Sequence, residues 1–262
     1  MVLELLVSPH EAHREPQDLF LLSFLFVSLG VVLRVILPTM DGSAVVFAMV
    51  PAIPLIWTLL VREEKEDEEF HRQNRGFFDY HGDLIEIFAF FFLGASVAYA
   101  AWYVALPAET AKDVFASQLA EIRLVQGAVA TGAAFKPDSF QFLFGHNLQV
   151  LALMFLFSLV YGIGSIYLLL WNASVIGVFV GSHVYQSGLI GVWQAAMGLI
   201  PHGSLEVIAY FIASISGGIL SVAISRRRWR YREFKYVMID VFVLAGLSLA
   251  ILAAAAFVES SY

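Results

Sequence analysis

From Phe140 to Ile200 the chain contains no Asp, Glu, Lys or Arg residue. A helix needs about 20 consecutive apolar residues to cross a bilayer, so this uncharged block predicts at least two membrane spans. Two places could divide it. The Gly162–Ser165 stretch is one, and Trp171–Asn172 is the other. Because Asn is a common residue at helix N-termini, we favour the second.

Five more apolar runs predict further spans, and the whole chain is 60% hydrophobic and only 14% charged, unlike a soluble domain. We therefore expect an all-α fold, one polytopic transmembrane helical bundle of about seven spans over residues 1–262. The segment Gly188–Ile200 is too short for a span and predicts a half-helix before the sixth one. The five runs are Leu19–Leu37, Ser43–Val61, Gly82–Ala105, His202–Ser225 and Val237–Phe257.

The basic residues of the loops predict the orientation. The 62–81 loop carries four Lys and Arg residues and the 226–235 loop carries six, whereas 106–139 has three over a much longer stretch. The first two loops should be cytoplasmic and the third external. Seven spans with a cytoplasmic N-terminus satisfy all three loops, in a multi-pass protein of the cell membrane.

The same loops suggest contacts outside the bilayer. The charged 62–81 loop reads as a solvated helical extension of the second span, or as a face for protein partners. The arginines of 226–235 suit an anionic membrane surface, and we expect no nucleic-acid binding. The 106–139 loop has helical apolar spacing between Glu109 and Val129, which predicts a helix on the outer face or capping the bundle.

Small residues at intervals of four mark helix faces that can approach another backbone closely. In the sixth span Ala209, Ala213 and Gly217 form such a stripe, which His202 and Glu206 extend toward the N-terminus. A second stripe, in the fifth span, includes Gly177 and Gly181. Such stripes serve either packing within one chain or a homodimer.

Seven polar residues in or near the spans are the candidate functional residues: Glu86, His146, Asn147, Asn172, His183, His202 and Glu206. A carboxylate inside a membrane is costly unless it is paired or protonated, so Glu206 and Glu86 are the hardest to explain by packing. For Glu206 a local explanation exists. Pro201 would open the helix, the helix dipole would favour the carboxylate one turn later, and His202 would pair with it.

These residues also carry a family resemblance. His146-Asn147 stands at a span start, and Gly162 and Gly164 follow. Asn172 comes five residues before Gly177. The run Pro201-His202-Gly203, with Glu206, Ala209 and Gly217 after it, is the most specific part. Over about Phe140–Ser225 the chain resembles the stage II sporulation protein M family, of bacteria and archaea. The resemblance implies an all-helical integral membrane protein without known enzymatic activity. In spore-forming bacteria it implies a scaffold for cell-wall hydrolases. An acidic composition with only four Lys residues suits an archaeal-like source.

Three functions remain open. The first is a membrane scaffold or remodelling component without catalysis, whose partners are the lipid bilayer and proteins bound at the cytoplasmic loops. The second is a transporter or channel for a small solute or ion, using the intramembrane His, Asn and Glu residues. The third is a zinc-dependent intramembrane hydrolase with ligands among His146, His183, His202 and Glu206. The chain has no cysteine, so any zinc site lacks thiolates.

Overall fold

The structure is a computed structural model that describes residues 17–38, 44–73, 77–130, 140–161, 164–227 and 234–260. Every regular element in these ranges is an α-helix, which confirms the all-α prediction. In chain order the helices are α2 (Gln17–Ile36), α3 (Ala44–Gln73), α4 (Phe77–Ala105), α5 (Ala108–Val114), α6 (Ala116–Ala130), α7 (Phe140–Tyr161), α8 (Ser165–Ser187), α9 (Ile190–Ser225) and α10 (Phe234–Glu259).

Six of these helices, α2, α4, α7, α8, α9 and α10, contain a stretch long and apolar enough to cross a membrane. The remaining expected span is the shorter apolar stretch Ala44–Leu59. It opens α3, which passes through Pro51 and Pro54 and continues as a helix to Gln73. The predicted helical extension of the second span is therefore present in the backbone.

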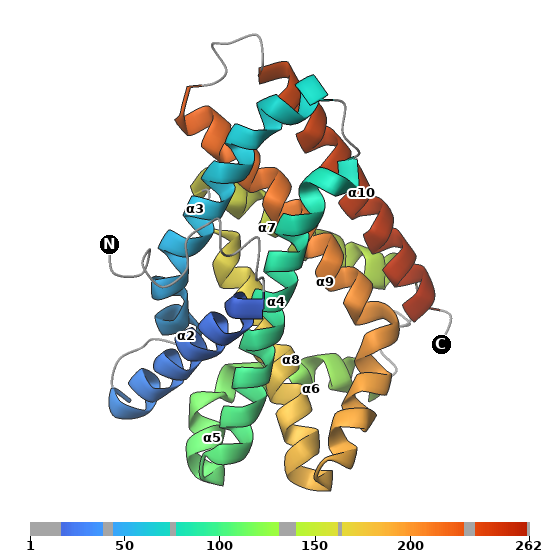
Figure 1. Cartoon of the computed structure of the whole chain (residues 1–262). Coiled ribbons are helices and arrows are strands. Elements are labelled where there is room, and N and C mark those ends of the chain that lie inside the picture. Colours follow the sequence, from blue (N-terminus) through green and yellow to red (C-terminus); the bar gives the residue numbers. More distant parts are fainter. Residues whose placement is uncertain are drawn as a thin grey trace.

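The helix ends alternate between two sides of the molecule. In Figure 1, α3 and α9 finish at the upper end, where α4 and α10 begin, while α5 and the connection from α8 to α9 lie at the lower end. The helix ends that flank the two basic loops thus share one side. This arrangement agrees with the expected alternation of spans, and which side faces the cytoplasm stays a prediction.

The boundary inside the uncharged block lies at the glycines and not at Asn172. Helix α7 ends at Tyr161 and α8 begins at Ser165. Asn172 lies two turns inside α8, where its side-chain amide donates a hydrogen bond to the Leu168 carbonyl at 2.8 Å. The N-cap interpretation of Asn172 was wrong, because an Asn inside a helix can bond to a carbonyl of that helix instead of capping its start.

The expected helix start at Pro201 was also wrong. The segment before it is helical, as the half-helix prediction required, but it joins the sixth span in one 36-residue helix, α9. Helix α9 changes direction along its length (Figure 1). Pro201 lies within this helix, and a proline inside a helix removes one backbone hydrogen bond and favours a bend.

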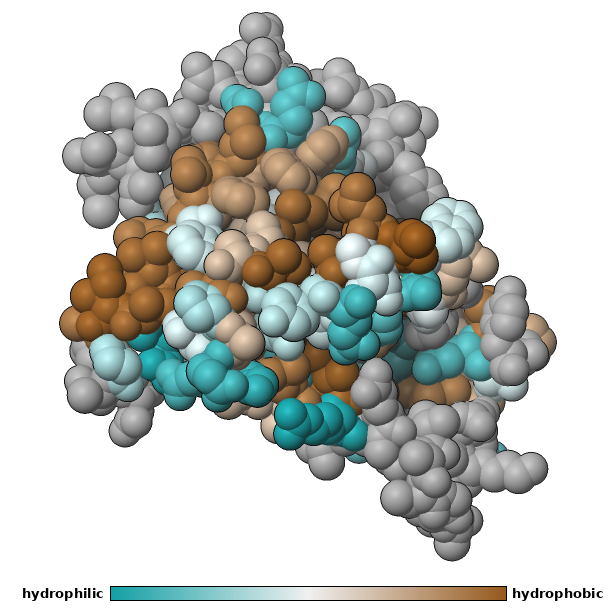
Figure 2. All heavy atoms as spheres, turned by 90° about the horizontal axis from the view of Figure 1, so that it is seen from below, coloured by the Kyte–Doolittle hydropathy of each residue, from teal (hydrophilic) through white to brown (hydrophobic). Residues whose placement is uncertain are grey.

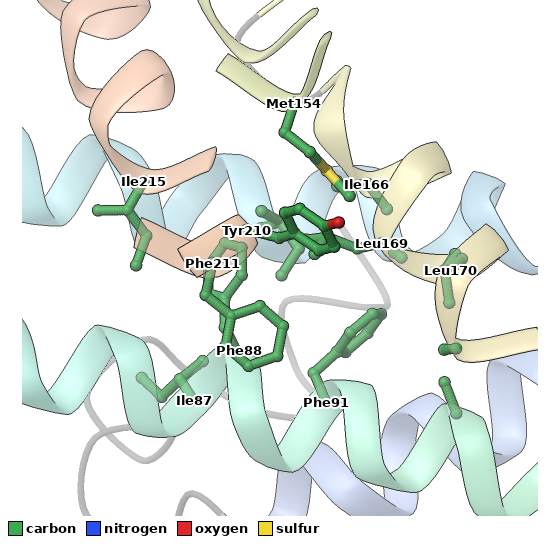
Figure 3. Packing of buried hydrophobic residues seen from close by; sticks show 14 of the residues in the cluster. Ile87, Phe88, Phe91, Met154, Ile166, Leu169, Leu170, Tyr210, Phe211 and Ile215 are labelled. Carbon is green, nitrogen blue, oxygen red and sulfur yellow. The ribbon is translucent and has the colours of Figure 1, made fainter. Parts of the chain in front are cut away.

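The core lies where four helices meet. Apolar side chains of α4, α7, α8 and α9 point toward one another in Figure 3, with Phe211 of α9 at edge-to-face contact with Phe88, ring centroids 6.1 Å apart. Phe92 approaches the same ring at 5.5 Å. Helix α9 is the central element, because 78% of its membrane-spanning apolar stretch is buried inside the bundle, against 17% of that of α7.

The segment that we expect to be external forms two short helices, α5 and α6, that are fixed to the bundle. Phe115, between them, is fully buried and packs edge-to-face on Tyr99 with ring centroids 6.3 Å apart. Three residues later the buried Gln118 donates a hydrogen bond to Ser174 of α8 at 3.0 Å. Of the two expected locations for this segment, these contacts favour capping of the bundle.

Candidate functional site

Asn147 and Glu206 form the central contact of the family-like region. The Asn147 amide, on α7, donates a hydrogen bond to Glu206 Oε1, on α9, at 2.5 Å. Asn147 is buried and Glu206 is partly buried. A hydrogen bond to a carboxylate is stronger than one between neutral groups, and the bond gives Glu206 a partner from a neighbouring helix. The helix-dipole explanation fails because Glu206 lies about four turns inside α9.

The small residues of α9 continue this contact along α7. A Cβ added to Gly217 would lie 2.4 Å from the Phe155 carbonyl oxygen. Ser158 of α7 donates a hydrogen bond to the Ser214 carbonyl at 2.7 Å. Ala209 and Ala213 are both buried. Two backbones can approach this closely only where no side chain intervenes. Along one face of α9, Glu206 is therefore followed toward the C-terminus by small residues that pack closely on α7.

The small residues of α8 face a different neighbour. A Cβ on Gly177 would lie 2.5 Å from the Ser96 carbonyl oxygen of α4, and one on Gly181 would lie 2.9 Å from that of Ala100. The two stripes therefore join two separate helix pairs, α7 with α9 and α4 with α8. Both stripes pack within the chain.

Asn172 and His183 do not join the Asn147–Glu206 contact. His183 Nδ1 lies 2.9 Å from the Phe179 carbonyl oxygen, and its ring packs on the Phe179 ring with centroids 4.4 Å apart. Like Asn172, it therefore bonds to the carbonyl four residues before it in α8. Both side chains therefore form hydrogen bonds within α8.

The other candidate residues lie elsewhere or outside the described side chains. His146 is exposed although its neighbour Asn147 is buried, and Glu86 of α4 is exposed as well. His202 lies in the helical backbone of α9, but its side chain is outside the described part, and so is its expected pairing with Glu206. Among the described residues, no three His, Cys, Asp or Glu side chains lie close enough together to hold a metal ion.

Two polar contacts on the α5 side were not foreseen from the sequence. One is the Gln118–Ser174 bond, for which a single Gln in a loop offered no signal. The other is the ion pair between Arg34 of α2 and Asp113 of α5, 3.1 Å apart. Nearby, Lys112 donates a hydrogen bond to Glu109, which lowers the pKa of that exposed carboxyl.

The fold and these contacts define a multi-pass, all-helical membrane protein in which polar and small residues join the spans to one another. The chain matches the family described as Stage II sporulation protein M over residues 84–261, about two thirds of its length, and it belongs to this family. The match begins in α4 and is wider than the Phe140–Ser225 region on which the resemblance rested. No curated protein and no solved structure matches the chain.

Proposed function

We propose that this chain is a non-catalytic scaffold or remodelling component of the cell membrane. One observation carries the proposal: the polar residues of the family-like core whose contacts the structure describes serve helix packing. Asn147 bonds to Glu206 across two helices, whereas Asn172 and His183 each bond to a carbonyl of their own helix. A transport or catalytic site needs several such groups to converge on one space, and these three contacts are separate.

The small residues support the same function. Gly217 and Gly177 lie against the backbones of neighbouring helices, where close approach holds a bundle rigid. A rigid bundle suits a protein that positions others at the membrane. The part of α3 beyond Leu59 continues past its apolar stretch to Gln73 and offers a helical surface for protein partners on the proposed cytoplasmic side.

The first experiment measures whether the protein moves solutes across a membrane. The purified chain and its Glu206→Gln variant are reconstituted into phosphatidylcholine–phosphatidylglycerol vesicles, and proton and potassium flux are recorded with fluorescent dyes. A scaffold shows no more flux than protein-free vesicles. Flux through the unaltered chain that Glu206→Gln abolishes would replace the scaffold with a transporter.

A second measurement examines partner contact in the cells that produce the protein. A photo-reactive phenylalanine analogue replaces Phe70, in the α3 extension, or Phe242, an exposed apolar residue of α10. A scaffold predicts cross-linking to one defined set of proteins from position 70 and none of that set from position 242. Equal cross-linking from both positions contradicts the proposed partner surface.

A further inference from the structure

The connection between α8 and α9 exposes a group of large apolar side chains. Helix α8 ends at Ser187, Gly188 turns the chain with a φ of +63°, and α9 begins at Ile190. Leu189 is 86% exposed, Trp193 68% and Met197 60%. We call the Leu189–Leu199 segment the α9 tip. Bundle packing within the described chain leaves this apolar surface uncovered.

Helix α4 shows where the α9 tip lies relative to the membrane. The 22-residue apolar stretch Leu84–Ala105 is about 33 Å long, close to the bilayer core of about 30 Å. Gly181 of α8 packs on Ala100, near the end of that stretch. Gly191 of α9 in turn lies against the His183 carbonyl. The α9 tip therefore begins near the membrane surface on the α5 side and runs back into the bilayer.

The composition of the α9 tip fits lipid. Between Leu189 and Leu199 the chain has no charged residue, and Gln194 is its one hydrophilic side chain. Trp193 of the tip and Tyr185 near the end of α8 are both exposed. These residue types concentrate at the membrane–water interface. Figure 2 looks onto this end of the molecule and shows broad hydrophobic surface beside a band of hydrophilic residues.

A contiguous exposed apolar patch marks an interaction site, so we expect this surface to contact a partner other than water. The tip and the rest of α9 run in different directions because α9 bends (Figure 1). The cationic residues Arg226 and Arg227 follow the far end of α9. The tip and those cations lie at opposite ends of one helix. At 1.5 Å per residue the 11 residues Leu189–Leu199 reach about 16 Å, roughly half of a bilayer core, which is the depth of one leaflet.

We propose that the α9 tip is a lipid-binding wedge, inserted into the leaflet on the α5 side with Leu189 near the headgroups and Met197 among the acyl chains. The inference rests on the proposed membrane function and deepens it by naming lipid as the partner of this surface. A wedge in one leaflet expands that leaflet alone, which is the asymmetry that membrane-remodelling proteins use.

Spin labelling tests the wedge directly. Because the chain has no cysteine, single variants Leu189→Cys, Trp193→Cys and Met197→Cys each carry one nitroxide without further changes. Lys112→Cys, an exposed cation on α5, is the water-facing control, and Phe242→Cys, 69% exposed on α10, is the lipid-facing control. The labelled proteins are placed in phosphatidylcholine–phosphatidylglycerol vesicles, and collisions with oxygen and with a water-soluble nickel complex are measured.

We expect oxygen to dominate at 197, as at 242, and less strongly at 193, while the nickel complex dominates at 112. Position 189 should fall between these controls. Dominance of the nickel complex at 193 and 197 would show a water-facing surface and overturn the wedge. Exclusion of both reagents with spin–spin broadening would show that a second copy covers the tip, and would overturn it equally.

A second measurement leaves the tip nearly unaltered. Quenching of tryptophan fluorescence by lipids brominated on their acyl chains is compared between the native chain and Trp193→Phe. The wedge predicts that Trp193 contributes quenched emission, whereas unquenched emission from Trp193 contradicts it. Neither measurement depends on solute flux or protein partners, so failure of the wedge and failure of the proposed function are distinguishable.

Discussion

Helices α7 and α9 share the Asn147–Glu206 bond, yet one is peripheral and the other central. The membrane-spanning apolar stretch of α9 is 78% buried and that of α7 is 17% buried, although both stretches are strongly apolar. The buried face of α9 carries Ala213, Gly217 and the fully buried Ser216. The outer face of α7 carries exposed Leu and Phe residues instead, including Leu156 and Phe157.

Hydrophobicity therefore does not select which helix becomes central in this membrane bundle. Lipid tails are as apolar as Leu, so burying a Leu against another helix gains little. What α9 gains by being central is close packing, and close packing needs small residues.

The first prediction concerns Gly217. In the variant Gly217→Leu the new Cβ alone would overlap the Phe155 backbone, which cannot move as a flexible side chain could. We expect almost no folded protein in size-exclusion chromatography of the detergent-solubilised chain. Gly246→Leu on α10 is the matched control, because no atom lies within 4 Å of its added Cβ. Equal recovery of both variants would show that the α7–α9 approach is looser than described.

The second prediction compares equal truncations on the two helices. Ile212 of α9 is 2% exposed and Leu153 of α7 is 44% exposed. Truncating Ile212 to Ala should lower the free energy of unfolding by about 1–3 kcal/mol, because the cavity costs packing contacts while transfer of the side chain from lipid adds little. Truncating Leu153 to Ala should change it by less than about 1 kcal/mol. The measurement is unfolding by sodium dodecyl sulfate in mixed micelles. Similar losses from both would remove the distinction between central and peripheral helix.

The third prediction concerns the bond that joins the two helices. A double-mutant cycle with Asn147→Ala and Glu206→Ala should give a coupling energy of about 1 kcal/mol, the size found for polar contacts between membrane helices. The same cycle with Glu86→Ala in place of Glu206→Ala is the control, since Glu86 is exposed on another helix. Coupling close to zero in the first cycle would mean that Asn147 and Glu206 act independently.

The smallest effect is expected at the Arg34–Asp113 ion pair, which lies outside both helices. Asp113 is 65% exposed, so Arg34→Gln should lower the free energy of unfolding by less than about 1 kcal/mol. The difference should shrink further in high salt because mobile ions screen exposed charges. A loss as large as that of Ile212→Ala would place the ion pair among the main supports of the fold.

Much of the fold could be predicted from runs of apolar residues. The spans, the helical extension of α3 and the alternation of helix ends all follow from the length and position of uncharged stretches. The two errors share one cause. Asn172 and Pro201 are helix-start residues by local preference, but neither begins a helix here, because in a membrane the backbone gains from staying helical wherever it meets lipid.

The candidate site was only partly predictable. Asn147 and Glu206 stand out in the sequence as polar residues in apolar surroundings, but nothing local pairs residues 59 positions apart. Gln118 and Ser174 show the same limit more sharply, since neither residue was singled out before the structure placed them in contact.

Runs of apolar residues and a local motif were enough to predict an all-helical membrane protein of one family, because lipid requires helices long enough to cross it. The fold alone showed that α9 is central, that Glu206 contacts Asn147 and that the α9 tip is left uncovered. Those outcomes depend on which small residues of distant helices fit against one another, and packing of that kind acts between segments that the order of residues does not pair.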